Sequence, residues 1–145
     1  QSKESKMLSK DQCVACGHKG TVTFTNRSFA IAHKYVTADV HGISGVECSH
    51  PECKEIVFNP DDGSAVRYSE SLDRLIARYR GHEMRRIRGK LGLTQKQMVE
   101  RVCGGGHNAV SRYEKGEICV PTPLWVLIVL LDKKPELLAE LSMKI

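Results

Sequence analysis

The sequence predicts an α+β protein in which a small β-rich domain precedes an all-α domain of about five helices. Three observations predict this organisation. Two close cysteine pairs bracket a run of short β-type segments in the first half of the chain. Apolar residues spaced three and four positions apart, the period of a helix, dominate the second half. A glycine break there separates two short helical patterns, which is typical of a helix-turn-helix.

The domain boundary is expected at a turn-rich segment in the first half of the chain. Asn59-Pro-Asp-Asp-Gly-Ser64 combines proline, glycine and acidic residues, a composition that marks a turn or hinge. We therefore assign residues 1–68 to the first domain, with residues 59–68 as linker and residues 1–10 disordered or derived from a tag. Residues 69–145 form the second domain.

The first domain carries a predicted metal site. Cys13 and Cys16 have two residues between them, the spacing of a tight metal-binding turn, whereas Cys48 and Cys53 have four residues between them. Because His50 and Cys53 have the shorter spacing, His50 stays open as an alternative to Cys48. Four thiolates from two turns give the closed tetrahedral site that zinc prefers, so we expect one structural Zn²⁺ per chain at Cys13, Cys16, Cys48 and Cys53. The β-type runs between these pairs cover residues 21–25, 28–36 and 43–47.

A structural metal also suits the size of this domain. Some fifty residues with few large apolar side chains bury little core, so a metal ion would supply the missing stability. The alternative is a redox enzyme that uses Cys13 and Cys16. That chemistry needs the pair at a helix N-terminus in a βαβ unit, whereas the flanking residues here predict turn and strand. Cys103 and Cys119 lie beside apolar positions and are expected to be small packing residues.

Positive charge is concentrated in the second domain. Residues 1–68 contain eight Lys and Arg against eight Asp and Glu, so the whole net charge of +5 lies in residues 69–145. The excess is densest in residues 74–101 and favours a polyanionic partner. A solvated helix face is the alternative. Two helices are expected in this region, one capped by Ser69 or Ser71 and ended or interrupted by Gly81, and one that carries Met84 and Ile87 inward.

Two further short helices form the predicted helix-turn-helix. Thr94 is the expected N-cap of the first, with Gln97 three residues later to complete a capping box. After Gly104-Gly-Gly106 the second helix begins near His107 and ends at Gly116. Asn108 and Arg112 share one face of it, four residues apart. An Asn side chain can form hydrogen bonds with the paired donor and acceptor of adenine, and an Arg side chain can donate to the two acceptors of guanine. This face is therefore suited to a major groove.

We expect Asn108 and Arg112 to read bases, with a helix cap or turn residue as the alternative role of Asn108. Lys96 and Arg101 are expected to contact phosphates. The predicted DNA-binding set is completed by Gln95, His107, Ser111 and Lys115.

A strongly apolar helix is predicted after the motif. Pro121 and Pro123 open it, and every residue from 124 to 131 is apolar, which predicts a helix buried on nearly every side. Because a small domain cannot cover all of this surface, we expect part of it, with Leu137, Leu138 and Leu141 of a last helix, to meet a second copy. The alternative is the central helix of a monomer. A dimer would place two recognition helices on a palindromic operator in double-stranded DNA.

The remaining sequence features restrict the functional class. The longest apolar run, residues 124–131, is too short to span a bilayer, and no signal-peptide pattern opens the chain, so we expect a soluble, intracellular protein. No paired carboxylates, phosphate loop or nucleophile–histidine arrangement stands out. We expect no enzymatic activity.

Three segments resemble a known family. Leu93-Thr-Gln-Lys, Gly104-Gly-Gly-His-Asn-Ala-Val-Ser-Arg-Tyr-Glu-Lys-Gly116 and Leu131-Asp-Lys-Lys-Pro-Glu-Leu-Leu138 resemble the XRE-type helix-turn-helix domain of the MqsA-type antitoxins. The cysteine pairs look like the zinc-binding domain of the same family. The resemblance implies a homodimer that represses its own operon, zinc at the four cysteines, and neutralisation of an RNase toxin by the zinc domain. It also implies a cytoplasmic bacterial protein that is associated with the nucleoid when bound to DNA. The alternative is a zinc-containing XRE-family transcription regulator without a toxin partner.

Overall fold

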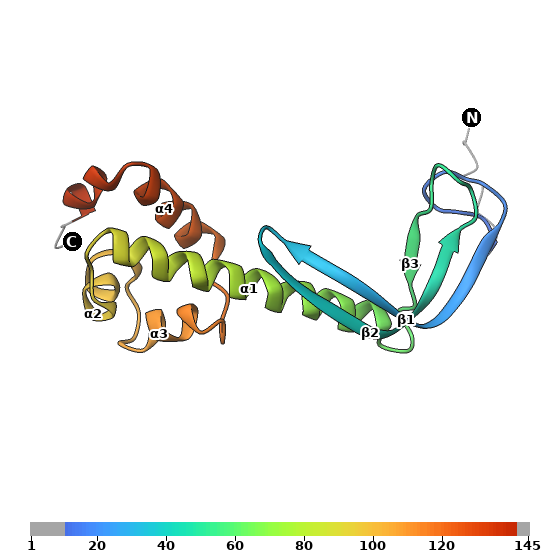
Figure 1. Cartoon of the computed structure of the whole chain (residues 1–145), viewed down its shortest axis with the longest axis horizontal. Coiled ribbons are helices and arrows are strands. Elements are labelled where there is room, and N and C mark those ends of the chain that lie inside the picture. The colour runs from blue at the N-terminus through green and yellow to red at the C-terminus, as the bar shows by residue number, and fades with distance from the viewer. Residues whose placement is uncertain (1–10, 142–145) are drawn as a thin grey trace, which may run out of the picture. The chain divides into compact units, whose positions relative to one another are not determined.

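The computed structural model describes residues 11–141, and the predicted disorder of residues 1–10 lies outside this range. Contacts group the described residues into two compact units. Unit 1 comprises residues 11–31 and 39–71, and unit 2 comprises residues 32–38 and 72–141. Strands come first and helices follow (Figure 1), which confirms the α+β fold class.

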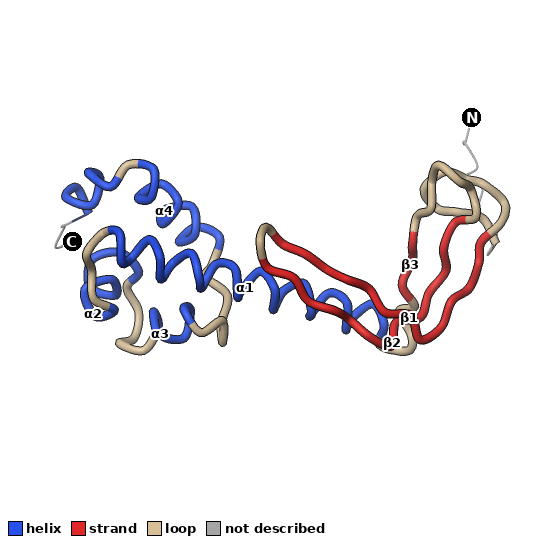
Figure 2. Tube along the Cα trace, viewed as in Figure 1, coloured by secondary structure: helices blue, strands red, loops and turns tan. Residues whose placement is uncertain are grey.

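Three strands form one sheet in the order β1-β2-β3: β1 Thr21–His33, β2 Val36–Cys48 and β3 Ile56–Phe58 (Figure 2). The predicted break after residue 25 is wrong, because β1 continues through Asn26 with a positive φ of 51° at that residue. A tight turn follows, in which Lys34 has a φ of 55°, and β2 begins at Val36. β3, which the sequence did not predict, pairs antiparallel with β2.

The segment expected as a linker is ordered against the sheet. The Asn59 N–H donates to the Ser44 carbonyl at 2.9 Å, and the Ser44 N–H donates to the Ser64 hydroxyl at 2.9 Å. The Asp62 carboxylate accepts from the Ser64 N–H at 2.9 Å, so it caps the helix that follows. That helix, α1, runs from Ser64 to Lys90. Residues 64–68 are therefore helical, and the predicted caps Ser69 and Ser71 lie inside the helix.

Gly81 does not end or interrupt α1, so that prediction is wrong. The helix is continuous over 27 residues, even though an interior glycine costs about 1 kcal/mol relative to alanine. A Cβ on Gly81 would lie 2.3 Å from the backbone oxygen of Tyr113. The missing side chain therefore lets another helix approach the backbone of α1 at this point.

The helices of unit 2 pack around the second half of α1 (Figure 1). Their common core contains Met84 and Ile87 from α1, together with Met98, Val110 and Ile128, each exposed by at most 1%. Arg86 and Lys90 also bond to Asp132 at 2.8 and 2.9 Å. The helical elements after α1 are α2 Gln95–Met98, the π-helical turn η1 Val99–Cys103, α3 Ala109–Glu114, α4 Thr122–Lys133 and the 3₁₀ helix η2 Pro135–Leu141.

The apolar helix α4 is only partly covered in a single chain. Ile128 and Leu131 are fully buried, but Val126 is 61% exposed and Leu130 is 42% exposed. The prediction that this helix is buried on nearly every side is therefore wrong for a single chain. Since Val126 and Leu130 are four residues apart, they form one open apolar stripe on the helix.

Candidate metal centre and nucleic-acid interface

The first cysteine pair lies on a turn closed by backbone hydrogen bonds. The Gly17 N–H donates to the Cys13 carbonyl and the Cys13 N–H donates to the His18 carbonyl, both at 2.9 Å. Gly17 has a φ of +75°, a conformation that glycine adopts without steric cost. The pair precedes a strand and not a helix, which is not the setting of a redox pair at a helix N-terminus.

The second pair lies on the turn that joins β2 to β3. Cys48 is the last residue of β2, and its N–H donates to the Glu55 carbonyl at 2.8 Å. The Cys53 N–H donates to the His50 carbonyl at 3.2 Å. The four intervening residues thus form a closed turn that points both thiols to the same end of the sheet.

The four sulfur atoms from these two turns lie within 4.8 Å of one another. Sγ of Cys13 is 3.8 Å from Sγ of Cys53, and Sγ of Cys16 is 3.6 Å from Sγ of Cys48. A tetrahedron of sulfurs about 2.3 Å from a central ion has edges of about 3.8 Å. The arrangement therefore fits a tetrahedral metal ion, and these four cysteines could hold one.

His50 lies beside this cluster but is engaged differently. Its Nδ1 accepts a hydrogen bond from the Glu52 N–H at 3.2 Å, and its own N–H points to Sγ of Cys48 at 3.4 Å. Cys48, and not His50, belongs to the group of ligand atoms that lie together among the described residues.

The thiols differ in acidity because of their surroundings. The backbone N–H of Cys16 lowers the pKa of Cys13 to about 7. At Cys48 the backbone N–H of His50 favours the thiolate, but burial and the neighbouring thiols outweigh it and raise the pKa to about 12. Thiolates this close repel one another unless a cation compensates their charge, which is what a bound metal dication does.

In unit 2, the predicted capping box at the start of α2 is confirmed. The Gln97 N–H donates to the Thr94 hydroxyl at 3.1 Å, and the Thr94 N–H donates to the Gln97 side-chain oxygen at 2.9 Å. Both bonds satisfy N–H groups that a helix start leaves without partners. The cap thereby sets the first residues of α2, including Gln95 and Lys96, at the surface.

Asn108 and Arg112 lie one turn apart on α3, Asn108 at its N-cap and Arg112 in its last turn. Asn108 occupies the N-cap position but its side chain makes no capping bond, so the amide is not consumed by the helix start. The Arg112 N–H donates to the Asn108 carbonyl at 3.1 Å, and both side chains are exposed. Val110 on the opposite face is fully buried. The helix is therefore oriented with these two polar residues outward.

The other predicted DNA-binding residues have varied surroundings. The Gln95 amide donates to the Glu114 carboxylate at 2.7 Å, and Lys96 lies 4.0 Å from Glu100. His107 and Lys115 are exposed, whereas Arg101 and Ser111 are half-buried. Gln95 is thus held against the end of α3, which joins the two helices of the motif.

Glu114 is a residue that the sequence prediction missed. Its side chain is only 5% exposed and accepts from Nε of Arg88 at 2.6 Å as well as from Gln95. Arg88 also donates to the Leu93 carbonyl at 2.9 Å. One carboxylate therefore connects α1, α2 and α3. No sequence spacing signals a pair that is 26 residues apart.

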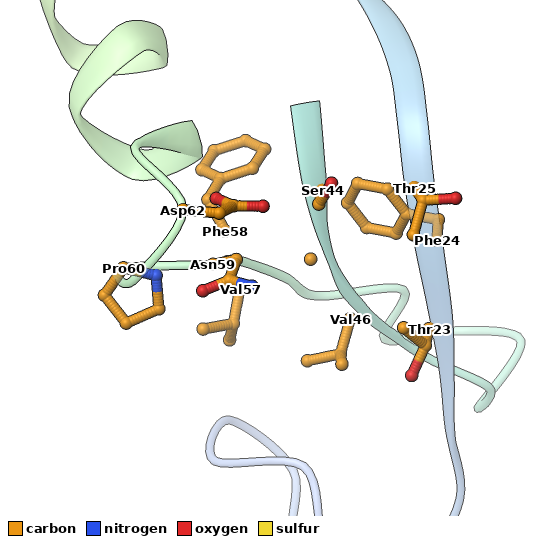
Figure 3. A pocket seen from close by; sticks show the side chains of 11 residues that line it. Thr23, Phe24, Thr25, Ser44, Val46, Val57, Phe58, Asn59, Pro60 and Asp62 are labelled. Carbon is orange, nitrogen blue, oxygen red and sulfur yellow. The ribbon is translucent and has the colours of Figure 1, made fainter. Parts of the chain in front are cut away.

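The sheet of unit 1 carries an apolar groove that was also not predicted. It has a volume of about 310 Å³ and is lined by residues of β1, β2 and β3 and of the turn before α1 (Figure 3). Phe24, Val46 and Val57 are among the apolar residues that line it, and Val57 is 42% exposed. β3 is an edge strand, and an edge strand beside an apolar surface is a typical docking site for another chain.

The fold and these sites define a class of protein in which a β unit able to hold a metal ion precedes a helix-turn-helix unit. Residues 11–142 match the family described as the antitoxin component of a bacterial toxin-antitoxin system, MqsA. The chain is 33% identical over 138 residues to the antitoxin MqsA of Escherichia coli (strain K12), which covers 90% of this chain and 98% of that protein. The chain therefore belongs to the MqsA antitoxin family, as its motifs indicated. No helix among residues 11–141 is long and apolar enough to cross a membrane.

Proposed function

We propose that this antitoxin represses its own operon by binding operator DNA through unit 2. The observation that carries the proposal is the placement of Asn108 and Arg112, exposed and one turn apart on the outer face of α3. Asn is suited to adenine and Arg to guanine in the major groove. Lys96, Arg101 and Lys115 would supply phosphate contacts, which give affinity without sequence preference.

A homodimer would give this site its symmetry. The open stripe of Val126 and Leu130 on α4 supports pairing, because apolar residues four apart on a helix are costly to leave in water. Two copies related by a two-fold axis would present their α3 helices to half-sites about one helical turn of DNA apart. The operator is accordingly expected to be a palindrome.

Zinc is the metal that best suits the cysteine cluster. Four thiolates at tetrahedral distances form the closed, structural type of zinc site, which has no open position for a substrate. Cys13, Cys16, Cys48 and Cys53 would be the ligands, one ion per chain. The ion's role would be to stabilise the turns that end the sheet of unit 1.

The toxin of such a pair is expected to be an RNase that unit 1 neutralises. The groove around Val57 and the edge of β3 support this assignment, since both offer apolar and backbone contacts to a second protein. The second candidate is a zinc-containing regulator without a toxin, which the same DNA-binding site would serve equally well. Co-purification with the product of the adjacent reading frame distinguishes the two: a stable complex supports the antitoxin, and its absence favours the regulator.

Selection of binding sites from genomic DNA tests the repressor proposal. The wild-type protein should enrich its own upstream region and a palindrome within it. Arg112→Ala should relax the base preference at one position of each half-site, at a cost of about 1–3 kcal/mol on the preferred sequence. Lys96→Ala is the matched control, because loss of a phosphate contact should weaken all sequences alike and reduce the salt dependence. Equal losses on selected and random DNA for Arg112→Ala would contradict its role as a base reader.

A further inference from the structure

The end of α3 places Glu117 beside Arg112 through its backbone. The Gly116 N–H donates to the Tyr113 carbonyl and the Glu117 N–H donates to the Arg112 carbonyl, both at 3.0 Å. Gly116 has a φ of +72°. These two bonds and the left-handed glycine form a Schellman motif, which folds the chain back over the last helical turn. Glu117 is thus fixed next to Arg112 before any side-chain contact is considered.

The side chains then form an ion pair of specific geometry. The Glu117 carboxylate lies 3.4 Å from Nε of Arg112, with the two side chains 51% and 54% exposed. The contact engages Nε and not the two terminal nitrogens of the guanidinium. Those terminal nitrogens are the edge that can donate together to O6 and N7 of guanine. The pair therefore restrains the Arg112 side chain without occupying its reading edge.

This ion pair differs from the other pair at the end of the same helix. Glu114, one residue before the cap, is buried with Arg88 and holds three helices together. Glu117 is half exposed and bonds only Arg112 among the described side chains. Exposed ion pairs contribute little to folding stability. Glu117 should therefore contribute little to folding stability, and its substitution should leave the domain folded.

We propose that Glu117 is a positioning residue that orients Arg112 for guanine and discourages its use on other DNA. This inference rests on the DNA-binding function proposed above. A restrained side chain loses less rotational freedom when it binds, so the ordering cost of reading guanine is reduced. The carboxylate also repels the phosphates of any duplex, and this repulsion weakens binding to sequences where Arg112 gains no base contact.

Glu117→Ala tests the proposal in fluorescence anisotropy titrations. The probes are the duplex obtained by site selection and a random duplex of equal length. The variant should bind the selected duplex about two- to tenfold more weakly, which is the cost of ordering one long side chain, while binding random DNA at least as tightly as before. Glu117→Gln should recover part of the lost affinity, because the amide oxygen can still accept from Nε. Thermal melts should show both variants folded.

Two controls separate positioning from a general charge effect. Glu140 is an exposed carboxylate on η2. Glu140→Ala removes the same charge without breaking the contact to Arg112, so it should change the affinities for selected and random DNA by the same factor. In an Arg112→Ala background, Glu117→Ala should cause no further loss of selectivity. The inference about Glu117 is overturned, without affecting the proposed function, if Glu117→Ala leaves selectivity unchanged. The same holds if Glu117→Ala lowers selectivity equally in the wild-type and Arg112→Ala backgrounds. A wild-type protein that prefers no sequence would overturn the proposed function, and this inference with it.

Discussion

The backbone oxygen of Tyr113 lies so close to Gly81 that a Cβ atom at position 81 would be only 2.3 Å from it. Helix α1 and helix α3 are therefore in backbone contact at Gly81. This contact sets the distance at which α3 packs against α1, and a single methyl group should change it.

Gly81→Ala should destabilise the protein although alanine is the better helix former. The added methyl group would force α3 away from α1, and overpacking of this kind costs about 1–3 kcal/mol. Gly89→Ala is the matched control in the same helix, since a Cβ there meets nothing within 4 Å. It should stabilise by up to about 1 kcal/mol. Chemical denaturation followed by circular dichroism measures both, and changes of the same sign would contradict the packing argument.

Removal of the proposed zinc ion should unfold residues 11–58 and spare the helices. A chelator strong enough to strip zinc should abolish the ordered amide signals of residues 11–58, while ellipticity at the helical minimum stays near its original value. Elemental analysis should find one zinc per chain in the wild type and none in Cys13→Ser. Cys119→Ser, at an exposed cysteine outside the cluster, should keep its zinc. Folding of residues 11–58 that resists the chelator would refute a structural metal.

Leu130→Glu should convert the protein from a dimer to a monomer without unfolding it. Leu130 is 42% exposed in the single chain, so a charge is tolerated there in a monomer but not across an apolar interface. Sedimentation velocity at several concentrations measures the change. Val66→Glu, at an apolar residue of unit 1 that is 54% exposed, should stay dimeric. A wild-type protein that is monomeric at high concentration would exclude the dimer.

Acid should weaken the connection between α1 and α4. Hydrogen bonds from Arg86 and Lys90 lower the pKa of Asp132 to about 2, below the value of about 3.9 for an unfolded chain. Because the folded pKa is depressed, the contribution of Asp132 is complete above about pH 4 and is lost as the pH falls towards 2. Asp132→Asn should therefore cost up to about 1 kcal/mol at pH 6, a small value for a partly exposed pair, and progressively less as the pH falls through about 2. Urea titrations across this range would show whether the difference converges.

Local sequence rules predicted the parts of the site that depend on neighbouring residues. The capping box at Thr94 and Gln97 follows from residues three apart, and it forms as expected. The cysteine spacing likewise indicated two turns that could share an ion, and their sulfur atoms do lie together. The outward placement of Arg112 followed from helical periodicity with Val110 inward.

The features that were missed depend on contacts between distant residues. Gly81 was interpreted as a helix break because propensity describes an isolated helix, whereas the packing of Tyr113 decides the outcome here. The pairing of Glu114 with Arg88 spans 26 residues. The groove next to Val57 required a third strand, and three residues are too few for a recognisable alternation.

The carboxylate of Glu114 limits which of the proposed DNA-binding residues can be substituted without loss of stability. Because one carboxylate oxygen of Glu114 accepts a hydrogen bond from the Gln95 amide, a substitution at Gln95 without a donor would leave that oxygen without its partner, which costs about 1–3 kcal/mol. New operator preferences should therefore arise at Asn108 and Arg112, which carry no such obligation to the core. If these residues bind DNA as proposed, fewer positions are free to change its sequence preference than would face the duplex.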